Sequence, residues 1–419
     1  MFMQFSSPAN KVLAGIVLTF AIVIGLLLPS RLNVPESQTF ADDAGQYHQT
    51  AVHVAEQGFF SFDGVTPYAY REPGYSVFLG GIYKLFGIGN RTAIFLVQAL
   101  ALLGAALFFV TRLKYIGVST AARNVCLALL LLFPATFHII FFVYRECFVL
   151  SLMLLLAGAT LHFHQRRSWD WAVVMGVVLA LINLSYLSFL FLPIALLPLF
   201  PLYKWRWRYV LAVLVLPYAL TMLWGVRNLH ADGHFRLIDP DRTAVMWYVR
   251  GEQAERVTAF EAPKCLWAEY ISRNWTGRSD ACSFNGLMHA KWPDGKPLGN
   301  EAALAKAGQA KILAHFPNYL AFSVWEIVEF HLPYVNGWGF AYNLSAAIGS
   351  LILYVGCALG LWTLRRREFA LFWLLIGYTV AVFVLTDATP RYLMPIVFCY
   401  ALLASVGYTA AFARFRKHS

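Results

Sequence analysis

The stretch Ala41–Tyr75 reads ADDAGQYHQTAVHVAEQGFFSFDGVTPYAYREPGY and separates two strongly apolar parts of the chain. It carries carboxylates, aromatic side chains and the adjacent pair Arg71 and Glu72. A charged group just outside the hydrocarbon of a membrane stays ionised at little cost and can still act on a molecule held in lipid. We therefore predict that this stretch forms a catalytic surface at the membrane boundary.

The composition of the whole chain predicts an all-α polytopic membrane protein. Only 13% of the 419 residues are charged and 59% are hydrophobic, and the mean hydropathy is +0.59, whereas about a quarter of residues are charged in an ordinary soluble domain. The net charge of +11 does not indicate a nucleic-acid partner, because most Lys and Arg residues stand in short clusters between apolar segments and no binding motif accompanies them.

Apolar windows of about 20 residues can span the hydrocarbon core, and the sequence predicts about ten such helices. They cover residues 12–29, 92–111, 124–143, 147–163, 171–187, 188–203, 209–225, 344–363, 369–386 and 393–412. The first window resembles a signal peptide in outline, but it lacks a small-x-small cleavage site and is expected to be retained. The fifth and sixth windows are separated only by a soft polar break before Pro193.

Basic clusters between the windows set the predicted orientation. The clusters all fall on one side of the predicted membrane, and the positive-inside rule makes that side cytoplasmic. Both termini lie on the same side. The clusters are Arg112, Lys114 and Arg123; Arg166 and Arg167; Lys204, Arg206 and Arg208; Arg365 to Arg367; and Arg414, Arg416 and Lys417. Two long polar segments then lie outside. We accordingly divide the chain into helices 1–225 with a catalytic first outer loop at 31–91, a large outer loop or lid at 226–343, and C-terminal helices at 344–419.

Local signals predict two helices in the first outer loop. Residues 41–58 contain no proline and repeat apolar positions at helical spacing, so a short amphipathic helix should begin at Asp42 or Asp43. Asp42 alone could equally be an N-cap. A second helix, Pro73 to Phe86, should lie in the membrane interface and stop at Gly87.

The second outer loop contains a helix-like run, Asn300 to Ala314, and an apolar segment at 317–332 that we interpret as an interfacial or re-entrant helix. Cys265 and Cys282 share this loop, and a disulfide between them is plausible. The other four cysteines fall in apolar segments, where a thiol behaves as a small core residue. No cysteine pair has metal-site spacing.

Several outer turns should converge on one face. Their candidate site residues are Asp42, Asp43, Arg71, Glu72, Tyr144, Arg145, Glu146, Arg227, Asp387, Arg391 and Tyr392. A carboxylate there can take a proton from an acceptor hydroxyl, while arginines hold a leaving phosphate. Two simpler roles stay open, since Arg391 could be a snorkelling anchor and the Arg145-Glu146 pair could be an ordinary polar turn.

Four sequence patterns carry a resemblance to a known family. They are Asp43-x-x-x-Tyr47-x-x-x-Ala51 running on to Gly58-Phe59-Phe60, Pro73-Gly74-Tyr75 and Leu85-Phe86-Gly87; the Arg145-Glu146 turn; Trp224-x-x-Arg227-Asn228; and Arg391-Tyr392-Leu393-x-Pro395. Taken together in this order, they resemble the GT-C class of membrane glycosyltransferases. The branch concerned includes protein O-mannosyltransferases and the lipid A aminoarabinose transferase.

This resemblance implies an inverting glycosyltransferase with a GT-C-like helical bundle. A sugar would pass from a polyprenyl-phosphate donor to a glycan, lipid or protein acceptor at the outer face of the inner (plasma) membrane. An acidic residue of the first outer loop is the family's catalytic carboxylate, and Asp43 matches its position better than Asp42 does. Many members carry a second acidic residue directly afterwards, where this chain has Ala44. The other candidate side chains would bind substrate, and we expect no cofactor and no metal.

Two other functions are compatible with such a topology. A flippase or transporter of a lipid-linked saccharide would place its ionisable residues near the midplane of its spans, whereas here they cluster at the outer ends. A non-catalytic scaffold subunit would not need Asp43.

Overall fold

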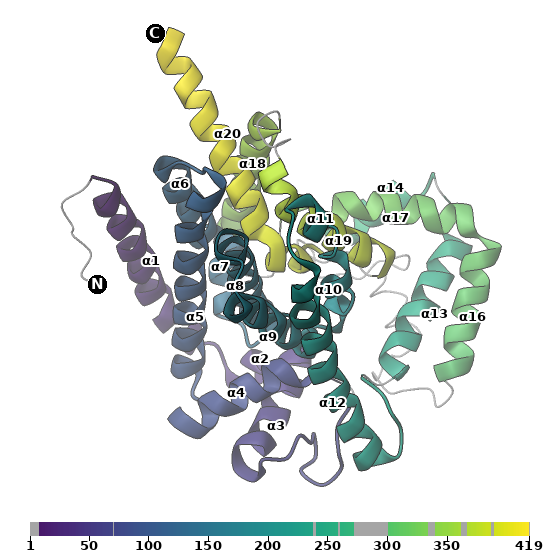
Figure 1. Ribbon diagram of the computed structural model, residues 1–419. Helices are drawn as coiled ribbons and strands as arrows, with labels where there is room; N and C mark the ends of the chain where they lie inside the picture. Colours follow the sequence, from purple (N-terminus) through teal and green to yellow (C-terminus); the bar gives the residue numbers. More distant parts are fainter. Residues whose placement is uncertain are drawn as a thin grey trace.

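The computed structural model describes residues 8–69, 71–237, 240–258, 260–271, 301–333, 340–361, 367–386 and 389–418. Within these residues the chain is helical, and its β pairing is a single isolated bridge between Ser61 and Pro67. Figure 1 shows a bundle of helices with α3 and α4 gathered at one end and α20 projecting from the other. The all-α prediction is therefore confirmed.

Seven helices in the described residues are long and apolar enough to cross a membrane, some of them continued by a short turn. They contain α1 (Pro8–Leu32), α5 (Arg91–Arg112), α8 (Arg145–Arg166), α12 (Leu216–Asp232), α18 (Phe340–Gly360), α19 (Ala370–Thr386) and α20 (Val397–His418). An eighth span is formed if α6 (Thr120–Leu131) and α7 (Pro134–Ile140), which meet at a bend of 53°, are counted as one. The chain is an integral membrane protein.

Of the about ten predicted windows, eight lie in these spans when the bent pair is counted as one, and the other two correspond to shorter apolar helices of the described residues. The predicted fifth window is the 17-residue helix α9 (Trp169–Ser185), which is short for a span. The sixth is divided into η2 (Leu187–Phe189), α10 (Leu192–Ala195) and α11 (Leu199–Leu202). Pro193, Pro198 and Pro201 cannot donate the backbone hydrogen bonds of a continuous helix, which explains the division.

Short elements connect the longer helices. They are α2 (Glu36–Thr39), η1 (Leu113–Ile116), η3 (Trp207–Tyr209), the π-helical η4 (Leu211–Val215), η7 (Arg367–Phe369) and η8 (Pro390–Ile396). Two helix starts have side-chain caps that the sequence favours. The Asn90 side chain accepts a hydrogen bond from the Ala93 amide (3.1 Å), and the Ser119 hydroxyl accepts one from the Ala122 amide (3.2 Å).

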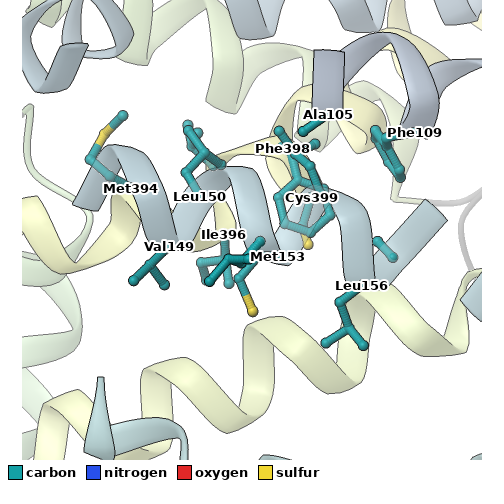
Figure 2. Close-up of a cluster of buried hydrophobic side chains, with 14 of the residues drawn as sticks. Ala105, Phe109, Val149, Leu150, Met153, Leu156, Met394, Ile396, Phe398 and Cys399 are labelled. Atoms are coloured by element: carbon teal, nitrogen blue, oxygen red, sulfur yellow. The ribbon is translucent and has the colours of Figure 1, made fainter. Parts of the chain in front are cut away.

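Helix α8 lies at the centre of the bundle, and most of its side chains are buried. Figure 2 shows Val149, Leu150, Met153 and Leu156 of α8 in a cluster that also contains Ala105 and Phe109 of α5 and Met394, Ile396, Phe398 and Cys399 of η8 and α20. This packing places the beginning of α8 beside η8. Arg145 and Glu146 at the start of α8 are thereby brought near Arg391 of η8.

The loop at 31–91 forms the two predicted helices. Helix α3 covers Asp42–Gln57 and ends at Gly58, whose φ of 66° lies in the left-handed region that glycine tolerates best. Helix α4 covers Pro73–Phe86, begins with proline and ends at Gly87. The two helices pack together through Tyr47 and Tyr75, whose rings meet edge to face with centroids 5.0 Å apart. Both predictions are confirmed.

The described part of the loop at 226–343 contains α13 (Pro240–Arg256), α14 (Ala262–Ile271), α16 (Glu301–Ala314) and α17 (Phe316–Phe330). A Cβ atom on Gly251 would lie 2.5 Å from the Gly308 carbonyl oxygen, so α13 and α16 approach too closely for any side chain there. The buried Arg250 is ion-paired with Glu326 and donates to the Val384 carbonyl (2.8 Å), which ties α13 and α17 to α19.

Some predictions for this region concern residues that the structure does not describe. Cys265 is disulfide-bonded, whereas its predicted partner Cys282 lies outside the described residues, so the pairing stays a prediction. Asp387 also lies outside them. The division of the chain at 225 and 343 and the cytoplasmic side of the basic clusters likewise stay predictions.

Candidate active site

The beginning of α3 places two carboxylates at the end of the bundle. Ala41 is the N-cap residue, with extended backbone, so the structure gives Asp42 the first helical position and not the N-cap. The Asp42 side chain is exposed, and its φ of 51° is unusual for a residue other than glycine. Asp43, in contrast, is about one-third exposed, with 31% of its side chain accessible. Negative charge in the first turn is favoured by the helix dipole.

Asp43 forms an ion pair with Arg71, through Oδ1 and Nη2. The Arg71 Nε also donates to the Gln46 Oε1 (2.6 Å), and its guanidinium lies over the Tyr47 ring, 5.3 Å from the centroid. Burial by itself lowers the pKa of Arg71, but the nearby Tyr47 and Asp43 outweigh it and raise this pKa above its ordinary value. Arg71 is therefore a permanent positive charge that holds one oxygen of Asp43.

Arg391 approaches the same carboxylate from the other end of the chain. Its Nη2 lies 3.5 Å from the Asp43 Oδ2, and its Nε lies 3.9 Å from the Glu146 Oε1. The same Nη2 donates to the Tyr392 hydroxyl (3.0 Å). The Arg391 side chain is 28% exposed, compared with 6% for Arg71 and for Arg145. Of these three arginines, Arg391 is the one that an incoming anion can reach.

A second ion pair lies beneath the first. Arg145 donates from Nη1 to the Glu72 Oε2 (2.9 Å), and the Leu187 amide donates to the Glu72 Oε1 (3.1 Å). The Arg145 guanidinium lies over the ring of Tyr186, only 3.5 Å from its centroid. Arg145 and Glu72 are both buried. These contacts join the start of α4, the start of α8 and the end of α9.

Tyr144 and Tyr186 complete the cluster with two aromatic rings. Tyr144 precedes α8, and Arg391 lies 5.8 Å from its ring centroid; burial raises the pKa of its phenol to about 12. Tyr186 follows α9 and packs edge-on against Tyr392, with centroids 6.1 Å apart. The sequence predicted only a soft polar break before Pro193, which contains Tyr186, and gave this residue no role in the site. Its position at the end of a helix, level with the outer turns, was the signal that it belongs to the site.

Arg227 contacts a different part of the loop at 31–91. It donates from Nη2 to the Phe60 carbonyl (2.7 Å) and from Nη1 to the Tyr68 carbonyl (3.1 Å), and its guanidinium lies over the Trp224 ring, 4.8 Å from the centroid. These contacts fasten the loop at 59–69 to α12. The geometry therefore assigns Arg227 to holding the loop, whereas the other predicted site residues described above surround Asp43.

The described residues contain no group of three or more His, Cys, Asp or Glu side chains that could hold a metal ion. The site consists instead of alternating charges. Asp43 lies between Arg71 and Arg391, and Glu146 is a second carboxylate near Arg391. Such an arrangement can accept a proton at one atom and stabilise an anion a few ångströms away.

Comparisons with known proteins found similarity only at the level of structure. No family model matches the chain, and no curated protein matches it in sequence. Two solved structures are similar to it: the crystal structures of ArnT from Cupriavidus metallidurans bound to undecaprenyl phosphate and in the apo state. Each is 17% identical, with 96% of this chain and 79% of the ArnT chain covered, and the TM-scores are 0.42 and 0.41. The resemblance drawn from the four sequence patterns concerns this same group of proteins.

Proposed function

We propose that this protein is an inverting glycosyltransferase that moves a sugar from a polyprenyl-phosphate donor to a hydroxyl group of a glycan, lipid or protein acceptor. The proposed reaction takes place at the outer face of the inner membrane. The observation that carries the proposal is the position of the Asp43 carboxylate between Arg71 and Arg391, beside the start of the apolar helix Pro390–Arg416. An acid-base group and an anion site are thus adjacent where a lipid phosphate would lie.

In the proposed step, the acceptor oxygen attacks the anomeric carbon while the bond from that carbon to the phosphate oxygen breaks. The proton of the acceptor hydroxyl passes to Asp43, and polyprenyl phosphate leaves with the electron pair. A carboxylate paired with an arginine is a weak base. It is sufficient here because the attacking hydroxyl becomes strongly acidic as its oxygen bonds to carbon, so proton transfer can come late.

Arg391 would bind the phosphate of the donor. Its guanidinium is the most exposed of the three in the cluster, and its distances of 3.5 Å and 3.9 Å to two carboxylates are longer than a tight ion pair. An incoming phosphate can therefore compete for its donors. A forked guanidinium suits two phosphate oxygens at once, and its charge stabilises the leaving group as negative charge develops.

To test the proposal, purified protein is incubated with a panel of radiolabelled polyprenyl-phosphate sugars, and the release of polyprenyl phosphate is measured. Wild type should release it with at least one sugar, and Asp43→Asn should reduce turnover by about 100- to 10,000-fold, the usual contribution of a positioned base. The matched control is Asp170→Asn, because Asp170 is an exposed carboxylate in the first turn of α9. Full turnover in Asp43→Asn would exclude it as the base, and inactivity of wild type with every donor would favour the flippase or scaffold alternatives.

A further inference from the structure

Two buried polar atoms beside Arg391 have no hydrogen-bond partner among the described residues. They are the Oε2 of Glu146 and the hydroxyl of Tyr186. Each residue is only 3% exposed. Buried polar groups in folded proteins are nearly always hydrogen-bonded, so two such atoms in one cluster mark a place where a polar ligand group fits.

The two residues are parts of one neighbourhood. Glu146 Oε1 lies 3.9 Å from the Arg391 Nε, and the Tyr186 ring packs against Tyr392, whose hydroxyl accepts from the same arginine (3.0 Å). Tyr186 also lies within electrostatic range of both Glu146 and Arg391. The unpartnered atoms therefore adjoin the guanidinium that is proposed to hold the donor phosphate.

The chemistry of these atoms selects the kind of group that they bind. A carboxylate oxygen accepts hydrogen bonds and repels phosphate, while a phenol both donates and accepts. Together they suit neighbouring hydroxyl groups, which need acceptors for their protons and a donor for an oxygen lone pair. A polyol matches this pair of side chains, and a phosphate or an apolar chain does not.

We propose that Glu146 and Tyr186 form a sugar subsite, which binds hydroxyl groups of the sugar carried by the lipid donor. This inference rests on the proposed function. It adds a residue, Tyr186, that selects the sugar-bearing lipid, and it separates the cluster into a phosphate side at Arg391 and a sugar side at Glu146. The Tyr186 ring also supports Arg145 from 3.5 Å, so the hydroxyl and the ring have different roles.

The experiment measures the affinity of the protein in nanodiscs for two probes, bare undecaprenyl phosphate and undecaprenyl phosphate carrying a hexose, with mannose and glucose tried in turn. Tyr186→Phe keeps the ring and removes only the hydroxyl, so it should weaken the preference for the sugar-bearing lipid by about 5- to 10-fold. Glu146→Gln removes a charged acceptor and should weaken it by about 10-fold or more. Affinity for bare undecaprenyl phosphate should stay unchanged in Tyr186→Phe.

Tyr218→Phe is the matched control, because the Tyr218 hydroxyl donates to the Leu190 carbonyl (2.9 Å) away from the cluster. Equal loss of affinity for both probes in Tyr186→Phe would mean a structural role and would overturn the subsite. So would a wild type that binds the bare lipid with no preference for either sugar, although the proposed function would then still stand. Binding of neither probe would reject the proposed function and the subsite with it.

Discussion

The buried ion pair of Arg145 and Glu72 allows the sharpest test of how the site is held together. Arg145→Met removes the 2.9 Å hydrogen bond to the Glu72 Oε2 and the stacking on Tyr186. The Glu72 side chain is only 5% exposed, so its charge is left in a low-dielectric environment, where the Leu187 amide still donates to it at 3.1 Å. Breaking a buried pair in this way costs about 3–5 kcal/mol, and the lost stacking adds about 0.5–2 kcal/mol.

The free energy of unfolding is measured in mixed micelles by titration with a denaturing detergent. Arg145→Met should lose about 3.5–7 kcal/mol relative to wild type, most of it from the broken ion pair. The double variant Arg145→Met with Glu72→Gln removes both charges of the pair and keeps an acceptor for the Leu187 amide. It should therefore be more stable than the two single losses predict, by about 1–3 kcal/mol. Arg166→Met, at the exposed end of α8, is the control and should change stability by less than about 0.5 kcal/mol.

Two results would refute this reasoning. If Arg145→Met were as stable as Arg166→Met, the pair would not be buried as the structure has it. If the losses from Arg145→Met and Glu72→Gln were simply additive, the two side chains would not interact, and the link between α4, α8 and α9 would lie elsewhere.

Three further predictions concern other contacts. Arg391→Lys keeps the positive charge but loses the forked pair of guanidinium donors, so affinity for undecaprenyl phosphate should fall about 10-fold while the fold stays intact. Unchanged binding in Arg391→Ala would contradict a phosphate role and leave Arg391 only a membrane-anchoring role. Arg227→Met removes two hydrogen bonds to backbone carbonyls, so amide exchange in residues 59–69 should rise by about 10-fold or more, and unchanged exchange would contradict the assigned role. Hydrogen bonds from Thr66 and Val65 hold the pKa of Asp63 well below its ordinary value of 3.8. The folded loop thus favours the ionised form of Asp63. The loop should stay ordered above pH 3.8 and lose its order as the pH falls further toward the pKa of Asp63 in the folded state. Amide exchange of Val65, corrected for the intrinsic rate, should then speed up at low pH, and protection that stays constant with pH would contradict the prediction.

Local patterns in the sequence predicted the elements that depend on local interactions. Helices α3 and α4 follow from apolar spacing, an N-terminal proline and glycines at the ends, and the structure has them at the predicted positions. Hydropathy windows likewise predicted most of the membrane spans. The window at 188–203 is divided into short helices, because a hydropathy window registers apolar length, whereas Pro193, Pro198 and Pro201 break the backbone hydrogen bonding inside that length.

The sequence by itself determined the class of protein, since hydropathy fixes it, and it placed the charged turns next to the ends of apolar segments. Only the tertiary structure decided which charges meet. Asp43 and Arg391 are 348 positions apart, and no local periodicity relates them. The contacts of Arg227 and Tyr186 could not be predicted from the sequence for the same reason. Arg227 fastens a loop, and the Tyr186 ring lies beneath Arg145. Side-chain partners across such separations are selected by the packing of α8 against its neighbours, which places the helix ends in register.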